Sequence, residues 1–360
     1  MANEQKDIAV IDLFCGIGGL SQGFVLEGFD VIAGYDNVLN CKFAYEKNNA
    51  DFYHRDITTL KGDELNNLFG KKVKILIGCA PCQPFSSYSF KIKDKDKDKV
   101  NLLYEFSRLI RECLPDIVSM ENVPQLLDFN KSSIINDFIE VLTSLGYKTD
   151  YKIVYCPDYG IPQTRKRLVL LASRLGDISL IKPTHSPENY TTVRDTIGKL
   201  TPVKAGEYDK KDPLHRARAL NQLNIKRLQH TKEGGGWKSW PKELLPECFK
   251  RKSGKTYGSV YGRMKWDNPS PTMTTHCTGL GNGRFGHPQQ DRAITLREAA
   301  LLQTFPNDYK FFESMETYNP SIICKQIGNA VPPMLGRIVA QSIKEHLKKY
   351  NSWHQKKQLV

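Results

Sequence analysis

Short apolar runs, separated by glycine turns and amphipathic segments, fill the first half of this chain. The runs are bounded by Gly, Pro or Asp, a pattern typical of buried strands in a parallel sheet. They lie at residues 8–14, 31–35, 75–78 and 115–120, and another strand is expected to end near residue 56. Apolar residues at helical spacing predict helices between them, at residues 20–25, 38–47, 100–114 and 132–145. This alternation predicts a doubly wound, mostly parallel α/β sheet with helices on both faces.

Two more apolar segments, Tyr151–Cys156 and Arg167–Ala172, bracket a turn and predict a hairpin. From about Leu180 the regular alternation stops, and basic residues mix with Gly, Pro and aromatic residues. Leu335 begins a final amphipathic helix whose apolar face needs a sheet to cover, so the chain is expected to return to its first domain. The expected domains are residues 1–180 with 317–360, and a smaller, irregular domain at residues 181–316.

Composition places the chain among ordinary globular proteins. It has 360 residues, of which 40% are hydrophobic and 25% charged. No apolar run is long enough to cross a bilayer, and the polar start at Met1–Lys6 lacks the apolar core of a signal peptide, so we expect a cytoplasmic protein without a membrane partner. Nine scattered cysteines suit a reducing compartment. Cys79 and Cys82 form a single C-x-x-C without a second pair at zinc spacing, so no metal site is expected, and a redox dithiol is the alternative.

The positive charge is concentrated in the second domain. The net charge is +13, and residues 180–260 hold 17 Lys and Arg against 8 Asp and Glu. A concentrated basic block favours a polyanionic partner through phosphate neutralisation, although a solvated surface is the alternative. The loop at residues 279–287 is rich in glycine and carries Arg284, and such a loop can enter a nucleic-acid groove.

Reactive side chains follow the predicted strands. Cys82 lies on a proline-flanked turn directly after the strand at residues 75–78, and Glu121 ends the strand at residues 115–120. Ligands and chemistry gather at the carboxyl ends of strands in open α/β sheets, so both side chains are candidates for catalysis. A buried structural thiol is the alternative for Cys82. Arg165 and Arg167 lie two residues apart, so in extended chain they point to the same side and suit a phosphate or a developing anion.

The first strand leads into a glycine turn and a helix. Cys15–Leu20 resembles the opening of a nucleotide site, where glycines admit the ligand and the helix offers free N–H groups, although the spacing is not a full G-x-G-x-x-G. Asp36 ends the next strand and can bind ribose hydroxyls, with a helix N-cap as the alternative. Asp56 and Ile57 end the third strand and can face an adenine. The Lys/Asp repeats at residues 93–99 predict an exposed loop, either a lid or plain surface.

Taken together, these motifs resemble the cytosine-C5 DNA methyltransferases of bacterial restriction–modification systems. Asp12–Gly19 is similar to the S-adenosylmethionine loop of that family. The other motifs are Pro81-Cys82-Gln83, Glu121-Asn122-Val123, the Q-x-R-x-R at Gln163–Arg167, Arg297–Pro306 and Gln326–Val331. The resemblance implies a Rossmann-like, class I S-adenosylmethionine-dependent methyltransferase with a target-recognition domain.

The resemblance also implies roles for residues. Cys82 adds to C6 of a flipped cytosine, Glu121 holds N3 and the exocyclic amine, and Arg165 supports the base and Glu121, with Arg167 in a lesser role. The implied cofactor-binding residues are Phe14, Gly16, Ile17, Gly18, Gly19, Asp36, Asn37, Asp56, Ile57, Pro81, Asn329 and Val331. The implied DNA-binding residues are Gln83, Ser86, Ser87, Lys99 and Arg284. The expected partner is double-stranded DNA, bound by a monomer in the bacterial nucleoid, with a cognate restriction endonuclease acting separately.

The sequence departs from the family pattern at two places, and three alternative functions remain. The loop after Phe85 lacks the glycine usual in the family, and Lys99 stands where an arginine is common, which affects the contacts of the loop. An RNA cytosine-C5 methyltransferase would use the same catalytic set, but the C-F-T stretch of the tRNA-modifying relatives is missing. A second alternative is a non-catalytic DNA-binding protein on the same fold. The third is a nicotinamide dehydrogenase, which fits the glycine loop but leaves Pro81-Cys82-Gln83 and Glu121 unexplained.

Overall fold

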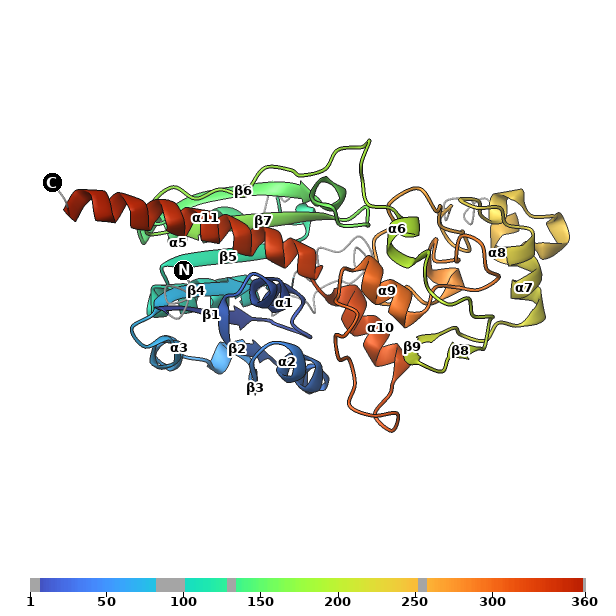
Figure 1. The fold of residues 1–360 in the computed structure, drawn as a ribbon, viewed down its shortest axis with the longest axis horizontal. Coiled ribbons are helices and arrows are strands. Elements are labelled where there is room, and N and C mark those ends of the chain that lie inside the picture. The colour runs from blue at the N-terminus through green and yellow to red at the C-terminus, as the bar shows by residue number, and fades with distance from the viewer. Residues whose placement is uncertain (1–6, 82–100, 128–133, 252–257, 359–360) are drawn as a thin grey trace.

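The computed structural model describes residues 7–81, 101–127, 134–251 and 258–358. Within them, seven strands form one sheet in the order β3-β2-β1-β4-β5-β7-β6 (Figure 1). The strands are β1 (Ile8–Leu13), β2 (Asp30–Asp36), β3 (Asp51–His54), β4 (Val73–Gly78), β5 (Ile117–Asn122), β6 (Lys148–Tyr155) and β7 (Lys166–Ser173). Strand β7 runs antiparallel to both its neighbours, and the other pairs are parallel. The predicted Rossmann-like sheet and its hairpin are therefore confirmed.

Helices cover both faces because successive residues of the central strands are apolar. In β1, Ile11 packs with helices on one face of the sheet and Val10 with helices on the other. The first face is covered by α3 (Gly62–Phe69), α4 (Asn101–Cys113) and α5 (Ile134–Ser144). The second face is covered by α1 (Gly19–Leu26) and α11 (Pro333–Gln358). The final helix thus returns to the sheet as predicted, and Figure 1 shows it lying along the sheet.

The sheet order fixes where a ligand can bind. Strand β1 has β2 on one side and β4 on the other, so the strand order reverses there, and ligands of open α/β sheets bind at such a reversal. The carboxyl ends of β1, β4 and β5 meet at one edge. In Figure 1 that edge faces the part of the chain that carries α6 (Val193–Ile197) to α10 (Pro320–Asn329).

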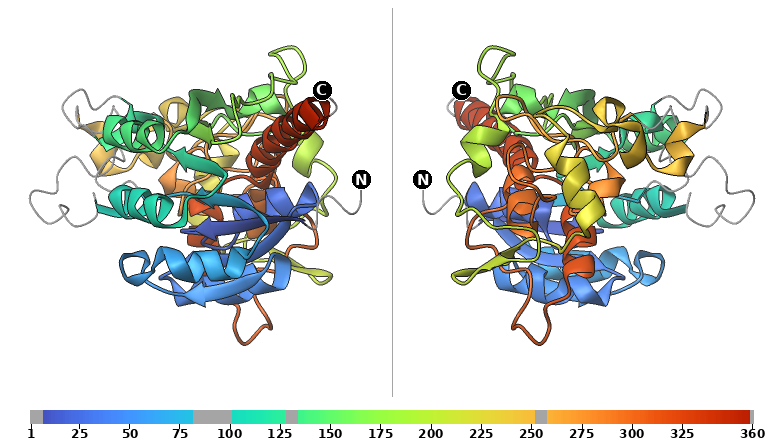
Figure 2. Two further views of the ribbon diagram at one scale, coloured as in Figure 1. Left: turned by 90° about the vertical axis from the view of Figure 1, so that its left-hand side faces the viewer. Right: turned by 90° about the vertical axis from the view of Figure 1, so that its right-hand side faces the viewer.

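Residues from about 190 to 295, as far as they are described, lie beside the sheet as a second body with little regular structure (Figures 1 and 2). Its elements are α6 (Val193–Ile197), β8 (Tyr208–Asp209), β9 (Asp212–Arg216), α7 (Gln222–Gln229) and α8 (Glu247–Lys250). Helices α9 (Leu296–Leu302) and α10 (Pro320–Asn329) lie between this body and the sheet. One continuous hydrophobic core joins the two bodies. It contains Ile17 and, on α2 (Lys42–Asn48), Tyr45, which pack in the same cluster as Met273 and Ile327. No helix in the described part of the chain meets the length and hydropathy of a membrane span.

A buried ion pair stabilises the start of α9. Arg292 and Glu298 are each 1% exposed, and two guanidinium nitrogens of Arg292 donate to the two carboxylate oxygens of Glu298 at 2.7 Å. Glu298 also accepts from the backbone N–H of Thr295, the N-cap of α9. These bonds hold the pKa of Glu298 below its usual range even though burial alone would raise it.

Arg292→Met is expected to lower the free energy of unfolding by about 3–5 kcal/mol, because it leaves the Glu298 carboxylate buried without its cation. Urea unfolding measures the change. Arg194→Met is the matched control, since Arg194 pairs with Asp267 at the surface, where their side chains are 54% and 71% exposed. The control is expected to change stability by less than about 1 kcal/mol. Equal losses in the two variants would contradict the structural role of the buried pair.

Candidate active site

The turn after β4 and the end of β5 lie side by side. Gly78 pairs with Met120 in the parallel register, so Cys79 and Glu121 are the next neighbours. The Asn122 side chain donates to the carbonyl oxygen of Ala80 at 3.1 Å, which ties the turn to β5. Asn122 stands in a quoted motif but was not predicted as a site residue. Its hydrogen-bond partner is set by the register of β4 and β5, which the sequence does not show. Pro81, a predicted cofactor contact, is exposed on this turn.

Five predicted site residues follow Pro81 and lie outside the described residues. They are Cys82, Gln83, Ser86, Ser87 and Lys99. The turn that ends at Pro81 lies at the same edge of the sheet as Glu121.

Glu121 is 7% exposed and pairs with Arg167. The Arg167 Nε lies 2.9 Å from Glu121 Oε1. Burial, and next the nearby Glu121 carboxylate, raise the pKa of the Cys79 thiol well above its ordinary value. The neighbouring Cys79 is therefore a neutral thiol, and its environment does not favour a thiolate.

Arg165 is more deeply buried than Arg167, and it donates hydrogen bonds to backbone carbonyl groups. It is 2% exposed, and its guanidinium donates to the carbonyl oxygens of Met273 at 3.2 Å and Ala330 at 3.4 Å. Burial lowers its pKa to about 9, with Arg167 as the next cause. The resemblance gave Arg165 the leading role beside Glu121, whereas in the structure Arg167 makes the ion pair and Arg165 joins distant segments of the chain.

Two glutamines complete this junction. Gln163 is fully buried, accepts from the Met273 N–H at 2.9 Å and donates to Gln303 Oε1 at 2.5 Å. Gln303 in turn donates to the carbonyl oxygens of Ile327 and Ala330 at 2.9 and 2.8 Å. Neither was predicted as a site residue, although both stand in quoted motifs. The available signal was the glutamine that opens the Q-x-R-x-R motif, whose amide can both donate and accept.

The glycine loop after β1 is held in left-handed backbone conformations. Phe14, Gly16 and Gly18 have φ angles of 60°, 53° and 83°, and an L side chain such as that of Phe14 rarely adopts such a value. The Gly16 N–H donates to Asp36 Oδ2 at 2.9 Å, while Asp36 Oδ1 accepts from the Val38 N–H at 2.8 Å. Burial raises the pKa of Asp36. The end of β2 therefore fixes the loop, and the remaining lone pairs of Asp36 stay available to a ligand.

A segment near the start of the sequence and one near its end meet at this loop. A Cβ on Gly19 would lie 2.1 Å from the Val331 carbonyl oxygen, so the helix start and the closing motif are in direct backbone contact. Ile17 and Val331 are buried, and Asn329 is exposed at the end of α10. The Tyr309 hydroxyl donates to the Ile17 carbonyl oxygen and adds a further clamp. Residues separated by more than 300 positions, such as Gly19 and Val331, are thus in contact.

The remaining predicted cofactor residues lie along the neighbouring strand ends. Strand β3 ends at His54, two residues before Asp56. Asp56 Oδ1 accepts from the Thr58 N–H at 2.9 Å, which caps the short helix that begins at Ile57. Ile57 is buried, whereas Asn37 is exposed just after β2.

Asp12 is a buried carboxyl that was not predicted as a site residue. It is 1% exposed, its Oδ2 accepts from Ser21 Oγ at 2.6 Å, and its Oδ1 has no hydrogen-bond partner among the described residues. Burial raises its pKa to about 7. An unsatisfied buried oxygen beside a glycine loop is a feature of ligand sites. Its signal in the sequence was an acid inside an otherwise apolar strand.

Arg284 has a structural contact in the described region. Its Nη1 donates to the carbonyl oxygens of Gly234 and Gly235 at 2.5 and 2.8 Å, so it orders a second glycine-rich segment. The predicted contact of Arg284 with DNA stays a prediction.

Comparison with known proteins gives one consistent family. The family model described as C-5 cytosine-specific DNA methylase matches residues 8–345. The Type II methylase M.HgiDII of Herpetosiphon aurantiacus is 55% identical over 341 residues, which cover 94% of this chain and 96% of the relative. The Type II methyltransferase M1.HphI of Haemophilus parahaemolyticus is 30% identical, with 93% and 86% covered.

Solved structures agree in fold. A DNA modification methyltransferase candidate encoded within an E. coli prophage superposes with a TM-score of 0.74 at 22% identity, covering 95% of this chain and 99% of its own. The Spodoptera frugiperda DNMT2 mutant superposes with a TM-score of 0.63 at 15% identity, with 93% and 99% covered.

Proposed function

Since this chain belongs to the C-5 cytosine-specific DNA methylases, we propose that it methylates C5 of a flipped cytosine in duplex DNA as the protective enzyme of a restriction–modification system. The observation that carries the proposal is the buried Glu121–Arg167 pair beside the turn that leads to Cys82. The acid motif and the turn that precedes the nucleophile motif lie at the same edge of the sheet, which supports the proposal. The same edge carries the glycine loop, so a cofactor and a base can meet there.

The residues at the glycine loop fit S-adenosylmethionine. The backbone at Gly16 leaves room for close approach, because a Cβ there would meet nothing within 4 Å, whereas a Cβ on Gly18 would lie 2.2 Å from the Asn49 side chain. The carboxyl groups of Asp12 and Asp36 can accept from the amino group and the ribose hydroxyls of the cofactor. Asn37, Asp56, Ile57, Pro81, Asn329 and Val331 are the further proposed contacts. When bound, S-adenosylmethionine supplies an electrophilic methyl group.

Cytosine C5 is a poor nucleophile until a group adds at C6. We assign that addition to Cys82, because a thiolate adds and later leaves as a good leaving group. A free thiol has a pKa of about 8.5, so the closed site must favour the thiolate. Glu121 accepts from the exocyclic amine and shares a proton with N3, which stabilises the ring as negative charge develops on it. Once C5 carries the methyl group, a base such as water takes the C5 proton, and the Cys82 thiolate leaves C6 to give 5-methylcytosine.

The arginines act around Glu121. Arg167 fixes the orientation of the carboxylate through its ion pair, and Arg165 holds the backbone at Met273 and Ala330. Gln83, Ser86, Ser87, Lys99 and Arg284 are the proposed DNA contacts. Flipping the cytosine costs a few kcal/mol, and the basic residues of the second body supply phosphate contacts that offset this cost. We further propose a monomer in the bacterial cytoplasm, with a restriction endonuclease acting separately on the same DNA sequence.

The test is to incubate the protein with methyl-labelled S-adenosylmethionine and either mixed-sequence duplex DNA or tRNA. Nucleoside mass spectrometry and then bisulfite sequencing identify the product and its sequence context. We expect 5-methylcytosine in DNA at one short sequence. Label in tRNA alone would replace the proposal with RNA methylation, and DNA binding without transfer would indicate a non-catalytic protein.

Gly19→Ala is expected to weaken S-adenosylmethionine binding at least about tenfold, because the new methyl group collides with the Val331 backbone and displaces one wall of the site. Isothermal titration calorimetry measures the affinity. Gly258→Ala is the matched control, since the nearest atoms to its Cβ belong to the Lys238 side chain at 3.7 Å. Unchanged affinity in the Gly19 variant would contradict the proposed cofactor site.

A further inference from the structure

Helix α10 packs closely on the segment Thr274–Thr278 of the second body. A Cβ on Gly328 would lie 2.2 Å from the carbonyl carbon of Thr274, so the helix touches this backbone directly. Cys324 lies four residues before Gly328 and therefore on the same face of the helix. Its Sγ is 3.7 Å from the Sγ of Cys277. Two cysteines thus face each other across the contact between the two segments.

The surroundings of this pair differ from those of an inert buried thiol. Both side chains are at most 2% exposed. The Thr278 hydroxyl donates to Cys324 Sγ at 3.5 Å, and a second hydrogen bond joins the two sulfurs. The hydrogen bond from Cys277 lowers the pKa of the Cys324 thiol to about 6. Burial opposes this shift, and hydrogen bonds from Thr278 add to it, whereas the pKa of Cys277 is raised. One sulfur therefore favours the thiolate and its neighbour the thiol.

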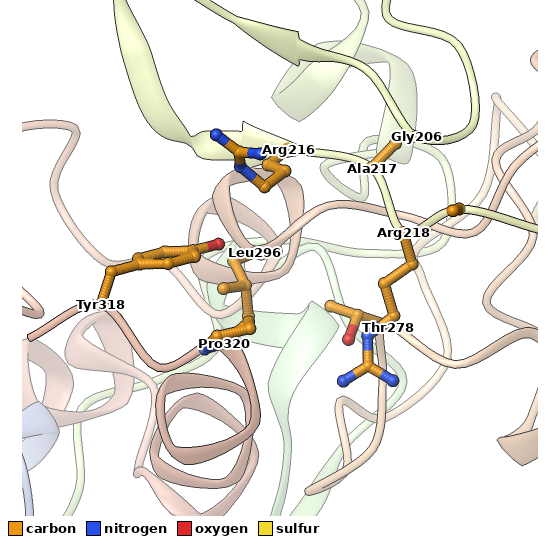
Figure 3. Close-up of a pocket in the computed structure, with 9 residues that line it drawn as sticks. Gly206, Arg216, Ala217, Arg218, Thr278, Leu296, Tyr318 and Pro320 are labelled. Atoms are coloured by element: carbon orange, nitrogen blue, oxygen red, sulfur yellow. The ribbon is translucent and has the colours of Figure 1, made fainter. Parts of the chain in front are cut away.

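A pocket of about 250 Å³ adjoins the pair. Its lining includes Arg218, Thr278, Tyr318 and Pro320, and Figure 3 shows the Arg218 side chain extending past Thr278. Pro320 begins α10, one turn before Cys324. Thr278, whose hydroxyl donates to Cys324, thus lines the pocket and directly follows Cys277 in the chain. The positive charge of Arg218 also favours a thiolate there.

The pair lacks the donors of a metal site. The described residues contain no group of three or more His, Cys, Asp or Glu side chains arranged to hold a metal ion. A pair of thiols at this separation is instead suited to two-electron oxidation.

We propose that Cys277 and Cys324 form a peroxide-sensitive dithiol that closes to a disulfide between the second body and α10. The Cys324 thiolate attacks one oxygen of a hydroperoxide, the O–O bond breaks, and a sulfenic acid and water form after protonation of the leaving hydroxide. Cys277 then attacks the sulfenic sulfur, the S–O bond breaks, and a second water leaves. Two thiols and one H₂O₂ thus give one disulfide and two waters. A thiol reductant reverses the step.

The cross-link would fix a junction that matters to the active site. Met273 immediately precedes the Thr274–Thr278 segment and Ala330 follows α10, and both carbonyl oxygens accept from Arg165. A disulfide across the same contact ties these two acceptors together by a covalent path. It also links positions 47 residues apart in sequence, which restricts the unfolded chain. Oxidation is therefore expected to raise the melting temperature by a few degrees and to do so reversibly.

The test is a titration of the full-length protein with hydrogen peroxide, followed by alkylation in denaturant and peptide mass spectrometry. We expect a Cys277–Cys324 cross-linked peptide in most molecules at a dose at which Cys248, an exposed cysteine, remains mostly alkylated. Dithiothreitol should remove the cross-link and restore the original melting temperature. Oxidation of Cys248 with Cys277 and Cys324 still alkylated would overturn the proposal.

Variants distinguish disulfide formation from a purely structural role of Cys277 and Cys324. In Cys277→Ala and in Cys324→Ala, the difference in melting temperature between oxidised and reduced protein should vanish, whatever the effect of either change on the reduced protein. Cys156→Ala is the matched control, because Cys156 is also fully buried, and it should keep both the cross-link and the temperature shift. A difference in melting temperature that persists in Cys277→Ala would show that other cysteines cause it. Because the readouts are chemical and thermal, they are independent of methyl transfer.

Discussion

Replacing Cys82 by alanine is expected to lower the rate of 5-methylcytosine formation by at least about 10³-fold, below what a methylation assay detects. The variant has no group that can add to cytosine C6, so C5 never becomes nucleophilic towards a methyl donor. Binding of duplex DNA should persist, since the proposed phosphate contacts come from the basic residues of the second body. The measurement pairs a labelled methyl-transfer assay with a DNA-binding titration of the same preparation.

The matched control is Cys248→Ala, which removes an exposed thiol far from the predicted chemistry in sequence. It should keep the wild-type rate. A second readout is covalent: wild-type protein should form a denaturant-resistant complex with DNA that carries 5-fluorocytosine, because fluorine cannot leave C5 as the proton does, and the Cys82 variant should form none. Residual methylation above a tenth of the wild-type rate in Cys82→Ala would contradict the proposed nucleophile.

The strands and helices of the sheet could be predicted because both of its faces are covered. Continuous apolar runs such as the one around Ile11 read as buried strands, and the amphipathic pattern around Phe106 reads as a helix with one covered face. The observed α4 and α5 end within two residues of the predicted bounds. The third strand was less well placed: it ends at His54, before Asp56, since it is short and mostly exposed and so lacks an apolar run.

The site could be predicted as a set of motifs but not as a set of contacts. Spacing placed Arg165 and Arg167 on one side of an extended chain, yet it could not tell which of them reaches Glu121. The partners of Arg165 lie 108 and 165 residues away, at Met273 and Ala330, and only the fold brings them close. The same holds for Asn122, whose acceptor is set by the pairing of β4 with β5.

Glu121→Gln is expected to lower the methylation rate by about 10²–10⁴-fold. The amide has nearly the shape of the carboxyl group, but it can neither carry the negative charge that pairs with Arg167 nor exchange a proton with cytosine N3. The loss should fall mainly on kcat, because the interaction strengthens as the ring becomes anionic. Single-turnover methylation measures it, and thermal unfolding of the same protein shows how much of the loss follows from a loosened fold.

Arg167→Met and the double variant divide the effect between chemistry and positioning. If Arg167 acts by orienting Glu121, its replacement slows methylation less than Glu121→Gln does, and the double variant is about as slow as Glu121→Gln alone. Such non-additivity is expected for side chains in contact, here 2.9 Å apart. Independent roles would instead multiply the two losses. Arg174→Met is a suitable control, since Arg174 lies just after the far end of β7 and donates to the carbonyl oxygen of Leu114 at 3.4 Å. Equal rates in Glu121→Gln and wild type would remove Glu121 from the mechanism and leave the Glu121–Arg167 pair a structural one.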